Sequence, residues 1–555
     1  MRIKYLIITF VISILISSCG KSPDIIYING KIHTLDENNN LVEAIAVRNG
    51  KIMDIGTSKE ITDKYSADKV INLENKTVIP GLIDCDGSLI EFSKRLYFTS
   101  YLNNVRSLEE LKSKIKEKAK ELKSGEWVVF YNLNLNNIPD SELEKINKKT
   151  VDEVSGNVNI VIVDSLRLFS ICNTKGLESL QITKFTPVPS KGEIQKDDSG
   201  ELTGLFFDEA QKVIYEKIPE PEAKEIFDAV EKGSKELLKY GITEVQDRSI
   251  GVGAIDLLKQ LIDSNKLPIK VYGVLTGDDE ASNEYTKKGI IENYKDKLSI
   301  RSVCLDYDGA FEYQDAVMKS PYKVDPKIKQ PYIDESTLTR IFDNAIEKNY
   351  QFRIKVVGDK GFSDIVSFLE KNIKNKNLKD HRIVLECVEF TNPSDINRIK
   401  GLDIIISIRP ETIIDDLDIV PNLITEDNLK NTALWKSILQ NSGRIIAGSG
   451  FPYDNQINPF IQMYFLIMRS NIESSTKAIP NQDQKLTILE ALKSYTLWAA
   501  YSSFEEKIKG SLEKGKNANM VVLSDDIFTQ NPDILLKIKV LKTIIDGIVM
   551  YDNTK

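Results

Sequence analysis

Short apolar runs alternate with amphipathic helical segments over about 400 residues of this chain, and no other feature constrains its fold as strongly. The runs that predict strands are 78–84, 159–163, 269–274, 300–305, 351–357, 382–388, 404–408 and 444–447. Helical segments such as 332–348, 363–374 and 487–500 lie between them. This alternation is typical of an α/β fold with a parallel sheet, most simply a (β/α)8 TIM barrel. We expect the barrel over residues 80–510, with an inserted subdomain at about 100–225 where extra strands interrupt the pattern.

Both ends of the chain carry strand and turn signals instead. The dipeptides Asn29-Gly30, Asn49-Gly50 and Asp546-Gly547 each interrupt an apolar run. Such pairs favour two-residue type I′ hairpin turns, because both central residues of that turn need a positive φ. We therefore expect one small β-sandwich built from both termini, residues 24–79 plus 511–555.

The first 18 residues have the pattern of a bacterial lipoprotein signal peptide. A positively charged start precedes an apolar run over 5–16, which is too short to span a bilayer. The small residues before Cys19 resemble a lipobox, which is cleaved before the cysteine and lipidated on it. We expect a lipid on Cys19, a tether over 19–23 and an extracytoplasmic protein anchored to the bacterial cell membrane or outer membrane. An ordinary secretory signal with a chance cysteine is the alternative.

Charge and histidine content narrow the possible functions. The net charge of −8 argues against a nucleic-acid partner, which requires a basic face. The chain has only two histidines, His33 and His381, so it cannot form a site from three or four histidines of its own. We expect both to be structural, at the surface or hydrogen-bonded. The four cysteines after Cys19 are widely spaced and predict free, buried thiols.

Several blocks of sequence, taken in order, resemble a known family. They are Val78-Ile-Pro-Gly-Leu-Ile-Asp84, Gly200-Glu-Leu-Thr-Gly204, Gly241-Ile-Thr243, Asp308-Gly309, Gly358-Asp359, Gly448-Ser449 and Gly510-Ser-Leu-Glu-Lys-Gly515. With these blocks the chain resembles the amidohydrolase superfamily, and within it amidohydrolase family 3, the group similar to N-substituted formamide deformylases. The resemblance covers nearly the whole mature chain. It implies a TIM barrel and metal-dependent hydrolysis of non-peptide C–N bonds.

The resemblance also implies metal ligands at the carboxyl ends of barrel strands, where zinc or another divalent metal would activate a water molecule. It places there a His-x-His pair, a bridging lysine, two further histidines and an aspartate that accepts the proton. In the same order, this chain has Asp86, Ser88, Cys304, Lys355, Leu385 and Gly450. Every principal ligand position is thus substituted, while the surrounding blocks remain.

Three arrangements could take the place of the implied metal site. Lys355 could pair with Asp86, offsetting the negative charge that a missing metal leaves behind. A rebuilt metal site is the second possibility, and its donors would be Asp86, Cys304, Asp308 and Cys387. The third is covalent chemistry with Lys355 or Cys304 as the nucleophile, although no histidine is available to act as its base.

We favour a degenerate family member that uses no metal cofactor and binds a small molecule at the barrel mouth, or serves as a scaffold on the membrane surface. The alternative is an active hydrolase for amide-type C–N bonds, with a site rebuilt from Asp86, Cys304, Lys355 and Cys387. The residues that we expect around the pocket are Asp86, Ser88, Cys304, Asp308, Lys355, Leu385, Cys387 and Gly450.

Overall fold

The computed structural model describes residues 22–554, except 104, 166, 278–279, 326, 416, 418, 454–455, 473–477 and 529–530. The predicted signal peptide and Cys19 therefore lie outside the described residues. The chain divides into two compact units. One comprises Met1–Leu89 together with Ser234–Lys555, and the other comprises Ile90–Gly233.

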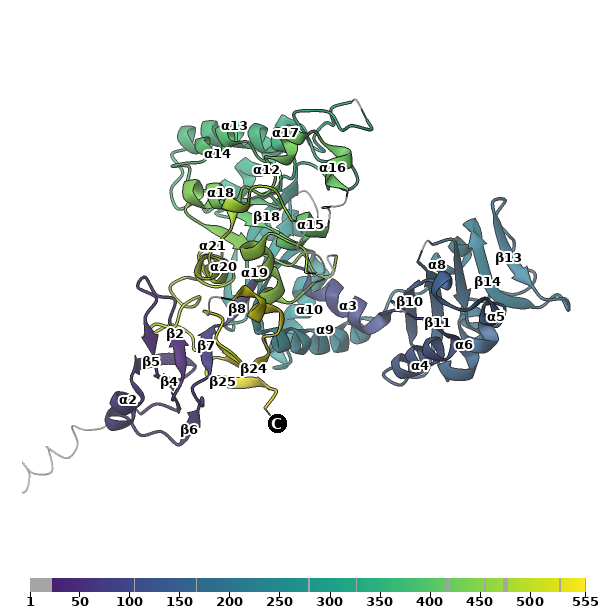
Figure 1. Ribbon diagram of the computed structural model, residues 1–555, viewed down its shortest axis with the longest axis horizontal. Coiled ribbons are helices and arrows are strands. Elements are labelled where there is room, and N and C mark those ends of the chain that lie inside the picture. Colours follow the sequence, from purple (N-terminus) through teal and green to yellow (C-terminus); the bar gives the residue numbers. More distant parts are fainter. Residues whose placement is uncertain are drawn as a thin grey trace, which may run out of the picture. The chain divides into compact units, whose positions relative to one another are not determined.

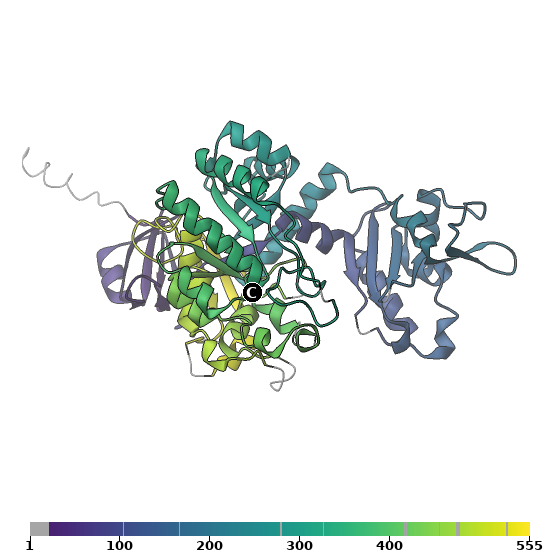
Figure 2. The ribbon, with the colours of Figure 1, turned by 90° about the horizontal axis from the view of Figure 1, so that it is seen from above.

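The larger unit contains eight parallel strands that form a nearly closed barrel with helices outside it (Figures 1 and 2). In spatial order the strands are β22 (Ile445–Ala447), β21 (Ile405–Ile408), β20 (Val384–Glu386), β19 (Gln351–Lys355), β18 (Leu298–Asp306), β16 (Lys270–Thr276), β15 (Ile242–Ile250) and β8 (Leu82–Gly87). A short antiparallel strand, β17 (Ile291–Tyr294), pairs with β18. The TIM barrel expected from the alternating pattern is confirmed.

The barrel closes where the segment after β22 meets β8. Gly450 donates its backbone N–H to the carbonyl oxygen of Asp86 at 2.8 Å. Ser449 donates its hydroxyl hydrogen to the carboxylate of Asp84 at 2.7 Å. A Cβ atom on Gly448 would lie 2.3 Å from the backbone nitrogen of Asp86, so this close approach requires glycine.

Helices follow most of the barrel strands. They include α10 (Val252–Asp263), α12 (Glu335–Glu347), α13 (Asp359–Asn375), α14 (Pro393–Arg398), α15 (Pro410–Asp415), α18 (Trp435–Ser442), α19 (Pro459–Met468), α20 (Ile488–Ser494) and α21 (Leu497–Ser502). Asp334 caps α12 by accepting the backbone N–H of Thr337 at 2.7 Å. The single helix expected over 487–500 is instead α20 followed by α21, because Thr496 leaves the helical region at φ −136° and ψ −94°.

Two further sheets of the larger unit pack into a β-sandwich. One has the order β5 (Lys51–Gly56), β4 (Ala44–Arg48), β1 (Ile25–Ile28) and β6 (Lys69–Asn72). The other has the order β25 (Ile548–Asp552), β24 (Val540–Ile545), β23 (Met520–Leu523), β7 (Thr77–Pro80), β2 (Lys31–His33) and β3 (Leu41–Val42). Tyr27 and Ile45 of the first sheet share a buried core with Val78 and Met520 of the second.

Two of the three predicted hairpin turns are confirmed. Asn49-Gly50 joins β4 to β5 and Asp546-Gly547 joins β24 to β25, with positive φ at all four residues. The prediction for Asn29-Gly30 is wrong. There the chain crosses between sheets, since β1 pairs with β4 and β6 whereas β2 pairs with β3 and β7. Burying the apolar residues of both strands between the sheets outweighs the local turn preference.

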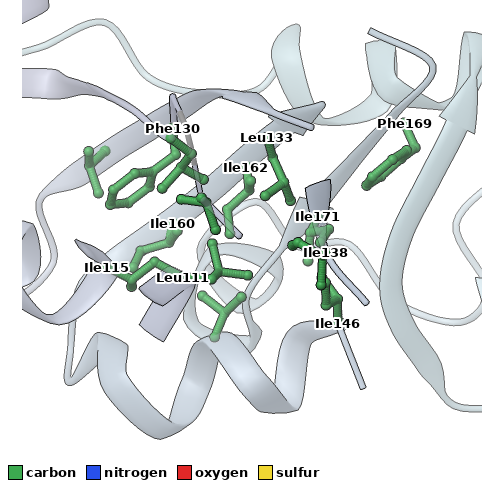
Figure 3. Packing of buried hydrophobic residues seen from close by; sticks show 14 of the residues in the cluster. Leu111, Ile115, Phe130, Leu133, Ile138, Ile146, Ile160, Ile162, Phe169 and Ile171 are labelled. Carbon is green, nitrogen blue, oxygen red and sulfur yellow. The ribbon is translucent and has the colours of Figure 1, made fainter. Parts of the chain in front are cut away.

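The smaller unit is a six-stranded sheet with a core on each face. Its strands in spatial order are β13 (Gly192–Lys196), β14 (Leu202–Asp208), β12 (Phe169–Cys172), β11 (Asn159–Asp164), β10 (Trp127–Leu133) and β9 (Thr99–Tyr101). Ile160 and Ile162 pack with Leu111 and Ile115 of α4 (Leu108–Ala119), as Figure 3 shows. Val161 and other alternate residues of β11 belong to the second core, because successive side chains of a strand point to opposite faces.

The four cysteines of the described residues are free and buried, as their spacing predicts. Among the residues that the structure describes, no helix combines the length and apolar character that crossing a membrane requires.

Candidate functional site

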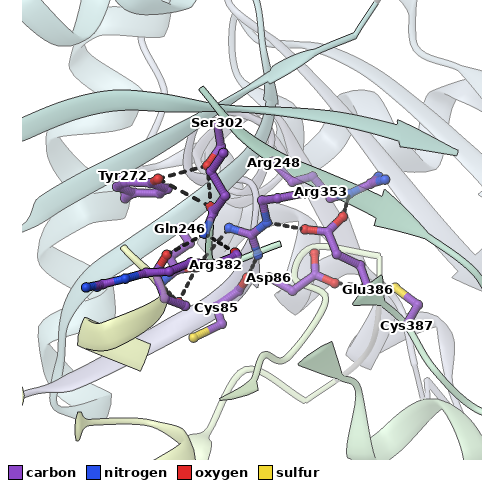
Figure 4. Close-up of polar contacts among 12 residues, drawn as sticks. Cys85, Asp86, Gln246, Arg248, Tyr272, Ser302, Arg353, Arg382, Glu386 and Cys387 are labelled. Carbon is purple, nitrogen blue, oxygen red and sulfur yellow. Dashed lines mark hydrogen bonds and ion pairs between the residues drawn. The ribbon is translucent and has the colours of Figure 1, made fainter. Parts of the chain in front are cut away.

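Five charged side chains gather toward the carboxyl ends of the barrel strands, and Figure 4 labels four of them, Asp86, Arg248, Arg353 and Glu386. They are Asp86 of β8, Arg248 of β15, Arg353 of β19, Glu386 of β20 and Arg409, which directly follows β21. We call these five residues the mouth cluster. The carboxyl-terminal end is where TIM barrels carry their functional residues, so this cluster is the candidate functional site.

Asp86 is bound by Arg409. Nε of Arg409 donates to Oδ2 of Asp86 at 2.7 Å, and Nη2 donates to Oδ1 at 3.2 Å. The thiol of Cys387 adds a weak hydrogen bond, with Sγ 3.6 Å from Oδ2. Burial by itself would raise the pKa of Asp86, but the charge and hydrogen bonds of Arg409 outweigh it and lower the pKa to about 2. Asp86 is therefore ionised, and both of its oxygens are occupied.

Glu386 binds two guanidinium groups, as Figure 4 shows. Nε of Arg353 lies 2.6 Å from its Oε1, and Nε of Arg248 lies 2.7 Å from its Oε2. Arg248 also pairs with Asp306, whose side chain is 46% exposed, whereas that of Glu386 is 2% exposed. Two cations on one buried carboxylate offset a charge that would be costly to bury alone.

The buried guanidinium of Arg353 extends these contacts into the barrel. Its Nη1 donates to Oε1 of Gln246 at 2.9 Å, and its Nη2 reaches the carbonyl oxygen of Cys85 at 3.5 Å. The side-chain amides of Gln246 and Gln351 both donate to Ser502 at the end of α21, at 2.9 and 2.7 Å. A continuous polar network thus links the mouth cluster to α21.

Two buried aspartates near the cluster behave in the opposite way to Asp86. Asp84 accepts hydrogen bonds from Ser449, and Asp247 accepts from the side chain of Ser88 and, at 3.0 Å, from the backbone N–H of Leu89. Burial raises the pKa of both to about 7 despite these bonds. Because neither has a guanidinium partner among the residues that the structure describes, each holds its proton far more readily than Asp86 does.

Lys355 does not pair with Asp86, so that prediction is wrong. Within the described part of the chain, Lys355 forms no ion pair within 4.0 Å. Arg409 takes the partner role, and its planar guanidinium donates two N–H groups in a fixed fork to the two carboxylate oxygens.

The other predicted site residues serve the scaffold in several ways. The carboxylate of Asp308 accepts three backbone N–H groups at 2.7 to 2.9 Å, which fixes the loops around it. Cys304 is buried beside Tyr272. Leu385 is fully buried within β20. Of the expected pocket residues, the structure therefore brings Asp86, Ser88, Cys387 and Gly450 near the cluster, and Cys304 interacts electrostatically with Arg248. Asp308 and Leu385 act structurally.

Both histidines make local structural contacts. The ring of His33 stacks on Phe528, with the ring centroids 3.7 Å apart, in the sandwich. Nδ1 of His381 accepts the backbone N–H of Ile383 at 3.1 Å, ahead of the first residue of β20. Burial lowers the pKa of both. Neither histidine belongs to the mouth cluster.

The residues of the mouth do not fit the divalent metal that the family resemblance implies. A metal site needs several ligands with free lone pairs, but Asp86 and Glu386 already bind guanidinium groups. Within the described ranges, no group of three or more His, Cys, Asp or Glu residues is placed to hold a metal ion. Three fixed guanidinium charges at this point also repel a cation.

The three arginines and Glu386 were not assigned a role from the sequence. Glu386 lies late in the run predicted at 382–388 and Arg409 follows the run at 404–408, and this position is the signal that could have found them. Arg248 lies in β15, which no predicted run covers. Arg409 is the clearest case, since it stands directly after the strand predicted at 404–408. The substituted ligand positions show that the implied metal ligands are missing, but they carry no information about arginines at other positions.

Comparisons with known proteins agree with this architecture. A family model described as "Amidohydrolase family" matches residues 69–551. YtcJ of Bacillus subtilis is 23% identical over 545 residues, covering 95% of this chain and 99% of YtcJ. The N-substituted formamide deformylase of Arthrobacter pascens is 24% identical, covering 96% of this chain and 99% of that enzyme.

Solved structures show the same fold. The structure of an uncharacterized metal-dependent hydrolase from Pyrococcus horikoshii superposes with a TM-score of 0.69 at 23% identity, covering 92% of this chain and 99% of that one. A second one, from Pyrococcus furiosus, gives a TM-score of 0.70 at 20% identity, covering 91% of this chain and 100% of that one. At this identity the likeness concerns the fold alone.

Proposed function

The chain belongs to the amidohydrolase family, and we propose that it is a member that binds a small molecule at the barrel mouth without metal-dependent hydrolysis. One observation carries this proposal: Asp86, which stands where the resemblance implies a metal-binding histidine, is occupied on both oxygens by Arg409. The relatives that the chain resembles are named as hydrolases, so the proposal concerns a change within the family.

Guanidinium groups replace the charge of a metal but not its chemistry. A divalent metal lowers the pKa of a bound water until that water becomes a nucleophile near neutral pH. An arginine keeps its proton at every physiological pH and cannot take one from water. The mouth cluster therefore favours holding a ligand over activating water.

The charges at the mouth indicate the chemistry of that ligand. The side chains of Arg248 and Arg409 are 16% and 19% exposed, and Lys355 is partly exposed without a carboxylate partner in the described residues. An anionic group such as a carboxylate or phosphate could bind these cations and compete with the exposed Asp306 for Arg248. We expect a small anionic ligand.

We also propose that a lipid on Cys19 anchors the protein at the outside of a bacterial membrane. The lipobox-like sequence before Cys19 supports this proposal. Metabolic labelling with a radioactive fatty acid tests it directly. Label should enter the wild-type protein and be lost in Cys19→Ser. Equal label in both proteins would contradict the anchor.

Metal content decides between the binding role and a rebuilt hydrolytic site. The processed protein is purified without chelators and analysed for zinc, manganese, iron and other metals, before and after incubation with each ion. We expect far less than one metal ion per chain in both cases. A near-stoichiometric metal that is lost in Asp86→Asn would overturn the proposal and favour the hydrolase.

The ligand itself is sought by thermal unfolding. A ligand that binds only the folded state raises the melting temperature as its concentration increases. Small carboxylates and phosphates are compared with neutral analogues of the same size. Stabilisation by the anions alone, lost in Arg248→Met, supports the proposed site; stabilisation by neutral analogues alone contradicts the anionic ligand.

A further inference from the structure

The two sheets of the sandwich leave a groove between their edge strands. Residues of the edge strand β6 of one sheet and of the edge strand β25 of the other line it. The groove has a volume of about 510 Å³. Its lining residues are Lys69, Ile71, Lys542, Val549, Met550 and Asp552.

Apolar side chains stand exposed along the edge strand β25. Ile548 and Met550 are 60% and 41% exposed, and they lie two residues apart on the strand. Neighbouring exposed apolar side chains on an edge strand favour an interaction surface. We call Ile548, Met550 and the groove residues the sandwich edge.

Lysines accompany these apolar residues. Lys69 lines the groove and is exposed, and Lys542 lines it while pairing with Asp552 at 2.8 Å. Apolar side chains next to lysines suit the boundary between lipid headgroups and acyl chains, where anionic lipids attract the cations. Lys69, on the edge strand β6, also opposes strand-to-strand pairing with a second copy of the chain.

The chain itself brings this edge to the predicted anchor. Ile25, the first residue of β1, is in register with Lys69, the first residue of the neighbouring parallel strand β6. Cys19 precedes Ile25 by six residues. Six residues span at most ~20 Å, so a lipid on Cys19 would hold this end of the sandwich close to the membrane.

We propose that the sandwich edge is a membrane-contact surface, which lays Ile548 and Met550 against the lipid. The inference rests on the proposed lipid anchor, which supplies the tether but does not by itself determine which face meets the membrane. The sandwich edge adds that orientation. It would place the protein on the bilayer in one pose rather than let it turn freely about its tether.

Fluorescence quenching in membranes tests the pose. The lipidated full-length protein is reconstituted into vesicles that contain anionic lipid, with an environment-independent fluorophore on Met550→Cys. The control is the same label on Tyr313→Cys, a residue that is 75% exposed in the loop after β18. The four other cysteines after Cys19 are buried, so labelling is selective. Lipids brominated on their acyl chains then quench only labels that reach the membrane.

We expect the label at 550 to lose most of its fluorescence while the label at 313 keeps it. Adding Ile548→Glu should restore much of the signal at 550, with an unchanged circular dichroism spectrum as evidence of folding. Vesicle-bound protein with no quenching at 550 would overturn the sandwich edge and leave the anchor intact. Protein that neither incorporates fatty acid nor floats with vesicles would refute the anchor first. Crosslinking between two chains at 550, without quenching, would show that a second copy covers the surface instead.

Discussion

Arg409 and Asp86 form a two-point ion pair at the barrel mouth, with Nε and Nη2 of the arginine 2.7 and 3.2 Å from the two carboxylate oxygens. The pair joins the segment after β21 to β8. These two strands lie on either side of β22 where the barrel closes. A buried ion pair is weak evidence of net stability, but removing one partner leaves an uncompensated charge. This asymmetry makes the pair testable.

Arg409→Met should lower the free energy of unfolding by about 3 to 5 kcal/mol, because Asp86 is then left charged and buried. The double variant Asp86→Leu/Arg409→Met should recover much of that loss. Lys59→Met, which breaks an exposed pair with Asp63, is the matched control and should change stability by less than about 1 kcal/mol. Chemical denaturation measures all three. Additive effects in the double variant would contradict the coupling.

Glu386 should matter far more than Asp306, although both bind Arg248. Glu386 is buried and holds two arginines, whereas Asp306 is largely exposed and holds one. We expect Glu386→Gln to cost about 3 to 5 kcal/mol of unfolding free energy. Asp306→Asn should cost less than about 1 kcal/mol, and urea unfolding of the two variants side by side distinguishes them. Similar losses of unfolding free energy in the two variants would show that burial of the carboxylate does not determine how much each ion pair contributes to stability.

Barrel closure depends on the missing side chain of Gly448. Gly448→Ala would press its Cβ against the backbone of Asp86, and we expect a loss of about 1 to 3 kcal/mol or more. Gly253→Ala lies in α10 with open space around the new Cβ, and it should instead stabilise by about 0.5 to 1 kcal/mol. Thermal unfolding gives the two opposite shifts. A tolerated Gly448→Ala would mean that the junction between β22 and β8 can move apart.

Asp84 should make the stability depend on pH. Its folded pKa of about 7 lies above the ordinary value of 3.8, so its protonation favours the folded state. The stability that it contributes is fully present below about pH 4 and is lost as the pH rises toward 7. Between these values the wild type should gain up to about 1.4 kcal/mol per pH unit on acidification relative to Asp84→Asn. Equal slopes for the two proteins from pH 4.5 to 6.5 would show that Asp84 is ionised throughout.

The hydrophobic periodicity of the sequence predicted most barrel strands, whereas the turn dipeptides predicted the local connections less well. Most barrel strands are short apolar runs, because they are buried on both faces. The exception is β15, which carries Glu244, Gln246, Asp247 and Arg248 and was not predicted. Asn29-Gly30 has the same turn signal as Asn49-Gly50 but leads into the other sheet. A dipeptide favours a backbone conformation, while the choice of partner strand depends on which apolar faces must be buried together.

The amino-acid sequence alone determined the fold class, the family resemblance and the lack of a histidine-built site, because these follow from periodicity, ordered blocks and a residue count. Only the tertiary structure decided what stands in place of that site. Asp86 and Arg409 are 323 residues apart in the chain, and strand order alone brings them together. The sequence pointed to Lys355 as the partner of Asp86, but the structure pairs Asp86 with Arg409. Pairing between distant side chains depends on positions that only the closed barrel defines.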